Sequence, residues 1–134
     1  MENLIKKLSF ICILLLLLLP ACTKTPESDL IGEWKGVDNK GKIASIVLEK
    51  NKQAKFIKES LVLDGTWSAN TTKNKKFIEL DLIVMQSTKT VTMPAIIRFL
   101  TKNKIQLKVT NDMVSRPEDF STTEDKNQIV LERQ

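Results

Sequence analysis

The side chains that could do chemistry in this chain are few, and most of them are carboxylates. Glu79 and Asp81 lie two residues apart, while Glu118-Asp119 and Glu124-Asp125 form two acidic pairs. Paired carboxylates can act as acid and base, and carboxylate oxygens can bind calcium. Neither acidic pair lies in a recognisable calcium loop. Glu79 and Asp81 fall on the polar side of an alternating segment, where we expect them to be solvated.

The composition excludes several other classes of catalyst. The 134 residues include no histidine, so Ser-His-Asp and Cys-His catalysis lack their base. Zinc and copper sites depend on cysteine and histidine, and the only cysteines are Cys12 and Cys22. The four glycines form no phosphate-binding loop. We therefore expect a protein that is not an enzyme and uses no metal or other cofactor.

Cys22 is the residue whose surroundings indicate a specific modification. Lys6 and Lys7 precede an apolar run, residues 8–19, that is shorter than the roughly 20 residues a membrane-spanning helix needs. A basic start, a short apolar core and a small residue are typical of a cleaved signal peptide. An ordinary secretion signal, with Cys22 incidental, is the alternative.

The segment Leu19-Pro20-Ala21-Cys22 resembles the lipobox of bacterial lipoproteins. The resemblance implies cleavage before Cys22, a diacylglycerol thioether on its sulfur, and fatty acylation, such as palmitate, on its new amino group. It divides the chain into a helical signal peptide (1–21), a lipidated tether (22–29) and a folded domain (30–134). The residue after the cysteine is Thr23 and not an aspartate. By resemblance to enterobacterial sorting, this implies the periplasmic side of the outer membrane.

The folded domain has to be stable without a disulfide. Cys12 would leave with the signal peptide and Cys22 would carry lipid, so no thiol pair remains. The formal net charge of the whole chain is +5, which is too modest to predict a nucleic-acid partner.

Short apolar segments, separated by polar turns, predict eight strands and no helix within the domain. Residues 78–84 alternate most clearly, and Asp64-Gly65 is the kind of pair that makes a turn. Pro94 fits the start of a strand or an edge. The expected strands are 31–37, 42–49, 54–63, 65–69, 78–84, 95–100, 105–109 and 129–133. Residues 54–63 also fit a helical stripe, but their position between strands favours a strand.

Short connections between these segments favour an all-β, antiparallel, up-and-down barrel of eight strands. Closure of such a barrel removes exposed edges. Its interior is wide enough either to be filled by side chains or to hold one small ligand. The candidate interior residues are Ile78, Leu80, Leu82, Ile105, Leu107 and Val109.

The first strand begins with Gly32-Glu33-Trp34, and the pattern recurs as Gly65-Thr66-Trp67. This resembles the Gly-x-Trp signature of small lipocalin-like bacterial barrels, as do Arg116-Pro117 before Phe120 and an arginine, Arg133, on the last strand. The resemblance implies that Arg133 packs over Trp34 and closes one end of the barrel. The expected structural signature is Gly32, Trp34, Gly65, Trp67, Arg116 and Arg133.

Two functions from different classes are compatible with these features. The first is a membrane-anchored envelope lipoprotein whose barrel binds a small apolar ligand. The alternative is a protein-interaction or inhibitor module with a side-chain-filled barrel, whose loops contact another envelope protein. The sequence does not identify the ligand-binding residues.

Overall fold

The computed structural model describes residues 27–73, 76–110, 112, 114–121 and 127–134. Cys22, the lipobox and Glu124-Asp125 lie outside the described residues. One short 3₁₀ turn, η1 (Ser28–Leu30), precedes the strands. No helix among the described residues is long and apolar enough to cross a bilayer. The strands are β1 (Gly32–Val37), β2 (Ile43–Leu48), β3 (Gln53–Lys58), β4 (Leu61–Asn70), β5 (Ile78–Gln86), β6 (Lys89–Thr101), β7 (Lys104–Val109) and β8 (Gln128–Arg133).

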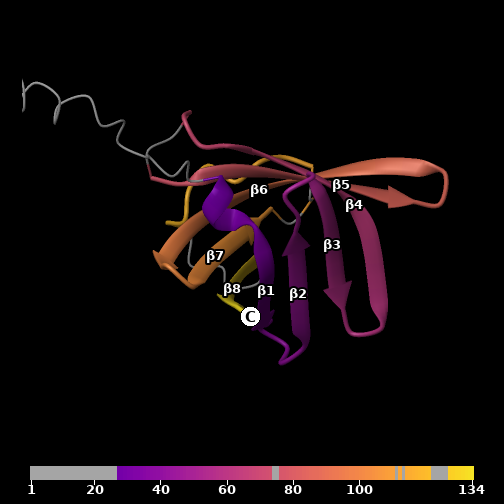
Figure 1. The fold of residues 1–134 in the computed structure, drawn as a ribbon, viewed down its shortest axis with the longest axis horizontal. Helices are drawn as coiled ribbons and strands as arrows, with labels where there is room; N and C mark the ends of the chain where they lie inside the picture. Colours follow the sequence, from indigo (N-terminus) through magenta and orange to yellow (C-terminus); the bar gives the residue numbers. More distant parts are fainter. Residues whose placement is uncertain (1–26, 74–75, 111, 113, 122–126) are drawn as a thin grey trace, which may run out of the picture.

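The eight strands form a closed antiparallel barrel in chain order, as the sequence predicted (Figure 1). Each strand pairs with the next, and β8 pairs with β1 through Arg133 opposite Trp34 and Leu131 opposite Gly36. Closure between first and last strand removes the two edges that an open sheet of this topology would expose.

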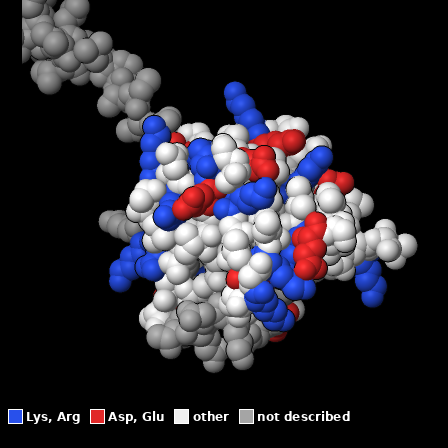
Figure 2. All heavy atoms as spheres, turned by 90° about the horizontal axis from the view of Figure 1, so that it is seen from below, with Lys and Arg blue, Asp and Glu red and all other residues white. Residues whose placement is uncertain are grey.

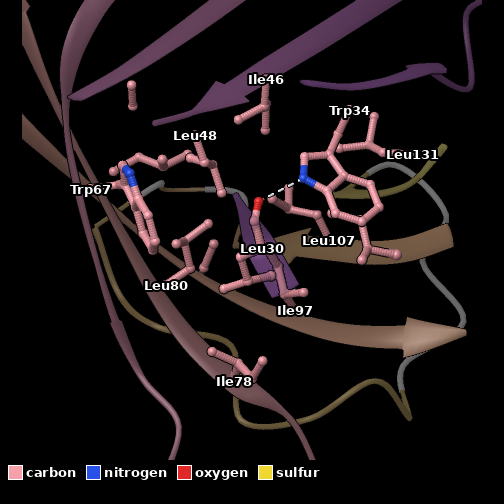
Figure 3. Packing of buried hydrophobic residues seen from close by; sticks show 14 residues of the cluster. Leu30, Trp34, Ile46, Leu48, Trp67, Ile78, Leu80, Ile97, Leu107 and Leu131 are labelled. Atoms are coloured by element: carbon pink, nitrogen blue, oxygen red, sulfur yellow. Dashed lines mark hydrogen bonds between the residues drawn. The ribbon is translucent and has the colours of Figure 1, made fainter. Parts of the chain in front are cut away.

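The interior is built from alternate residues of every strand, because successive side chains point to opposite faces. On β5, for example, Ile78, Leu80, Leu82 and Val84 are buried, while the residues between them are partly exposed. Five of the six candidate interior residues belong to the buried core, and Val109 packs against it. Leu30 from η1 is also part of this core, where it lies between Trp34 and Trp67 (Figure 3).

Two strand boundaries differ from the sequence prediction. Residues 54–63 were expected as one strand ending at a turn at Asp64-Gly65, but the chain turns earlier, at Glu59 and Ser60. Glu59 adopts a left-handed φ of 55° at this turn, although it belongs to a residue type that rarely marks one. Strand β4 then runs straight through Asp64 and Gly65.

Strand β6 begins at Lys89, before Pro94, so the proline is internal to the strand and does not start it. The prediction that Pro94 lies at an edge is nevertheless confirmed. The ladder between β6 and β7 begins only at Ala95, which faces Val109. Among the described strands, the first half of β6 therefore pairs only with β5, and the two strands form a hairpin that projects from the barrel (Figure 1).

Candidate functional site

One end of the barrel, here called the plugged end, is closed by η1, Trp34 and Arg133. Leu30 and Trp34 are completely buried, and the Trp34 indole N–H donates to the Leu30 carbonyl at 2.8 Å (Figure 3). The Arg133 guanidinium lies 4.2 Å over the Trp34 ring. This is the pair that the family resemblance implied. It links the last strand to the first by a cation–π contact.

Trp67 repeats this arrangement on the opposite side of Leu30. Its indole N–H donates to the Glu49 carbonyl at 2.9 Å, and the Lys52 ammonium lies 4.2 Å over its ring. Lys52 was not foreseen from the sequence. Each tryptophan of the Gly-x-Trp pattern is thus buried, bonded to a main-chain carbonyl and covered by a cation.

The two signature glycines leave room for close neighbours. Gly32 has a φ of +140°, which favours glycine, and a Cβ there would lie 2.8 Å from Nη1 of Arg133. At Gly65, a Cβ would lie 2.0 Å from the main-chain oxygen of Ile83. Glycine is therefore favoured at position 32 mainly by the backbone conformation and at position 65 by the packing of the neighbouring main chain.

The opposite end of the barrel, here called the mouth, contains a cavity of about 250 Å³. Its walls are mainly apolar and come from β2, β3, β5, β6, β7 and β8. Of the candidate interior residues, Leu82, Leu107 and Val109 lie at the cavity, while Ile78, Leu80 and Ile105 do not. The other apolar lining residues are Ala44, Ile46, Phe56, Met93, Ile129 and Leu131.

Charged residues lie on the rim of the mouth, at the β1–β2 connection and at the end of β3. Asp38, Lys40 and Lys58 line the rim, and the Lys58 ammonium lies 3.0 Å from the Asp38 carboxylate. The main-chain N–H of Lys42, the Lys58 side chain and the main-chain N–H of Lys40 together lower the pKa of Asp38 to about 2. Lysines and acidic residues are interspersed on the face seen from below in Figure 2, so neither sign dominates it.

Arg116 lies on the outer wall, in the connection between β7 and β8. Its Nη1 donates to the carbonyls of Leu80 and Ala95, at 3.2 and 2.8 Å, and its Nη2 lies 2.5 Å from Asp81. Arg116 thereby fastens the connection across the outside of β5 and β6.

The same connection also makes an aromatic contact on the outer wall. Phe120 packs edge-on against Phe77, with 6.3 Å between ring centroids, and Arg98 lies 4.5 Å over the Phe120 ring. Ile96, two residues before Arg98 on β6, is completely buried. The Arg-Pro-x-x-Phe segment therefore packs on the outer wall of the barrel.

Glu79 and Asp81 lie in ionic contacts on this wall. Asp81 contacts Arg116, and Glu79 lies 3.3 Å from Lys73 and 3.8 Å from Arg116. In the described part of the chain, no three His, Cys, Asp or Glu side chains come together as a metal site would require.

Comparison with known proteins shows a likeness at the level of the fold. No family model matches the chain, and no curated protein matches it. Among solved structures, the crystal structure of Treponema pallidum Tp0751 (pallilysin) aligns with a TM-score of 0.56 and 15% sequence identity, covering 84% of each chain. The chain is therefore similar to that Treponema protein in its fold, and the likeness extends no further.

Proposed function

We propose that this protein is a lipid-anchored envelope protein that binds a small apolar molecule, or the apolar part of a larger one, in the cavity at its mouth. It acts by binding and not by catalysis. The observation that supports the proposal is the apolar cavity of about 250 Å³, which lies at the end opposite the plug formed by Leu30 and Trp34.

The size of the cavity limits the ligand. It is larger than the cavity of about 150 Å³ that accepts benzene in other proteins, and slightly smaller than the pockets of about 300 Å³ or more that hold drug-sized ligands. A short acyl chain or a small isoprenoid fits this range. The rim at Asp38, Lys40 and Lys58 would then contact the polar end of such a molecule.

The existence of this cavity is the reason to prefer ligand binding to a barrel filled by its own side chains. Small and flexible residues, Ala44 and Met93, contribute to the wall where a larger side chain would fill the space. The interaction-module alternative gains support from a different feature, the edge of β6 along residues 89–94, with which no second described strand pairs.

The cavity proposal is tested by filling it. In Ala44→Phe, an aromatic side chain replaces a methyl group that is 5% exposed and points into the cavity. Ile43→Phe is the matched control, since Ile43 is the adjacent residue and is 54% exposed on the outside. Both are made in a Cys22→Ser chain, which carries no lipid of its own.

Straight-chain fatty acids of increasing length are titrated and followed by native mass spectrometry. We expect the parent and the Ile43→Phe chains to bind one short or medium chain, and Ala44→Phe to bind at least about tenfold more weakly, a loss of about 1.4 kcal/mol. Equal binding by all three chains, or no binding by the parent, would contradict the proposal.

A further inference from the structure

Among the described residues, no strand pairs with the outer edge of β6 beside the mouth. Strand β5 pairs along β6 from Lys89 to Ile97, whereas the ladder to β7 begins at Ala95. In the part of the chain that the structure describes, residues 89–94 therefore have a strand on one side only, and residues 89–92 are exposed. We propose that this edge binds an extended segment of a different protein, which adds a strand to the barrel wall next to the cavity.

The contacts of Arg116 establish which main-chain groups face the edge. A single nitrogen, Nη1, reaches the carbonyls of both Leu80 and Ala95, which are cross-strand partners. This is possible only where the two carbonyls converge between β5 and β6. Since residues along a strand direct their N–H and C=O groups alternately to either side, Pro94, Thr92 and Thr90 direct theirs away from β5, toward the open edge.

The presence of a proline at position 94 agrees with main-chain groups that point away from β5. Proline has no N–H, and it is tolerated where the missing donor would face no partner. Thr90 and Thr92 keep their N–H groups. The edge therefore presents the N–H groups of Thr90 and Thr92 and the carbonyls of Thr90, Thr92 and Pro94 to an incoming strand.

The edge lacks most of the features that prevent strand pairing. Exposed edges are usually protected by charged side chains, prolines or bulges. Here Lys89 and Pro94 lie at the two ends, and the residues between them are Thr, Val, Thr and Met, which favour strands or carry no charge. Such an edge is suited to strand addition, in which main-chain hydrogen bonds supply the affinity.

The side chains beside the edge indicate the partner's chemistry. Met93 lies opposite buried Leu82 and lines the cavity, so Val91 and Met93 are on the inner face and Thr90 and Thr92 on the outer face. A residue of the added strand that faced inward would lie near Met93 and the cavity. The expected partner is thus an extended segment with apolar residues at alternate positions, separated by polar ones. The proposal does not require the cavity to bind a free small molecule.

The test uses a seven-residue peptide, capped at both ends, that alternates leucine with threonine. A peptide of the same composition with its leucines consecutive is the control. Amide hydrogen exchange is measured for Thr90 and Thr92 in the Cys22→Ser chain. At a concentration tenfold above Kd, the alternating peptide should slow exchange of these amides about tenfold, because the edge is then free only about a tenth of the time.

Two changes test whether the hydrogen bonds of the edge are responsible. Thr92→Pro removes one edge N–H without altering the groups that face β5, so it should abolish protection at Thr90, while Thr92→Val should preserve it. N-methylation of the peptide at the residues facing β6 should also abolish protection, and this leaves the protein unchanged.

Equal protection by the N-methylated and the ordinary peptide would overturn the proposal, as would a lack of protection by either. Concentration-dependent protection without any peptide would mean that a second copy occupies the edge, which would also overturn it. Fatty-acid binding should be unaffected by Thr92→Pro, so the edge and cavity proposals can fail separately.

Discussion

At the scale of single residues, Arg133 on the last strand holds the segment that precedes and begins the first strand. Besides covering Trp34, its guanidinium donates to the carbonyl of Ile31 at 2.7 Å and to that of Asp29 at 2.6 Å. These carbonyls belong to the segment around η1, which places Leu30 in the core. One side chain on the last strand therefore holds the plug in place.

Replacing Arg133 by alanine should lower the free energy of unfolding by about 2–4 kcal/mol, through lost charge-assisted hydrogen bonds and the cation–π contact. Arg133→Lys should recover only part of the loss, since lysine lacks the planar fork. Chemical denaturation measures both. Arg98→Ala is the control, because Arg98 is exposed and covers Phe120 on the outer wall. Similar losses at both positions would contradict this role.

Single contacts were predictable from the sequence where a pattern carried them. The Trp34–Arg133 contact followed from the resemblance to lipocalin-like barrels. Lys52 over Trp67 did not, because it depends on a turn in which Lys52 takes a left-handed φ of 69° and on the alignment of β3 with β4. The place of Arg116 on the wall likewise depends on the path of a long connection that carries no periodic pattern.

At the scale of elements, Gly65 allows β4 to approach β5 closely. It lies inside β4 and faces Val84, so it is not a turn residue. A methyl group there would collide with the main chain of Ile83, which cannot move without disturbing the ladder.

We expect Gly65→Ala to destabilise the protein by about 1–3 kcal/mol, as overpacking does elsewhere. Thr66→Ala is the matched control, since Thr66 is the next residue on the same strand and is exposed. Thermal unfolding followed by circular dichroism compares the two. An unchanged melting temperature in Gly65→Ala would contradict this role, because β4 and β5 would then accommodate the methyl group without loss of stability.

The elements themselves were predictable to different degrees. Residues 78–84 alternate regularly, and the structure has β5 there. The turn between β3 and β4 was predicted at the wrong place. The actual turn residues, Glu59 and Ser60, are not glycine, proline or asparagine, while the Asp64-Gly65 pair, which is typical of turns, lies within a strand. The start of β6 was missed because an internal proline usually ends a strand, and here it lies just outside the β7 ladder.

At the scale of the whole molecule, the anchoring proposal makes a direct prediction at Cys22. Cys22→Ser removes the sulfur that would carry the diacylglycerol, so labelling by a fatty-acid analogue should be lost and the protein released from the membrane fraction. Ser9→Ala, within the apolar run of the leader, is the control and should leave labelling unchanged. A Cys22→Ser chain that remains membrane-bound would contradict lipid anchoring.

The closed eight-stranded barrel was predictable because turn signals recur at regular spacing and short connections favour antiparallel neighbours. The cavity was not, because it depends on how the volumes of side chains from many strands add up. Ala44 and Leu131, for instance, meet in its wall only because β1 lies between β2 and β8.

The chain enters and leaves the barrel at the same end. Residues 28–30 lie at the plugged end, and the main-chain N–H of Gln134 donates to the Glu33 carbonyl beside it. Residues 23–29 span at most roughly 23 Å when fully extended. A barrel anchored through Cys22 would therefore hold its plug toward its own bilayer and its mouth toward the aqueous space, so its ligand would arrive from solution or from a facing surface and not from the lipids in which it is anchored.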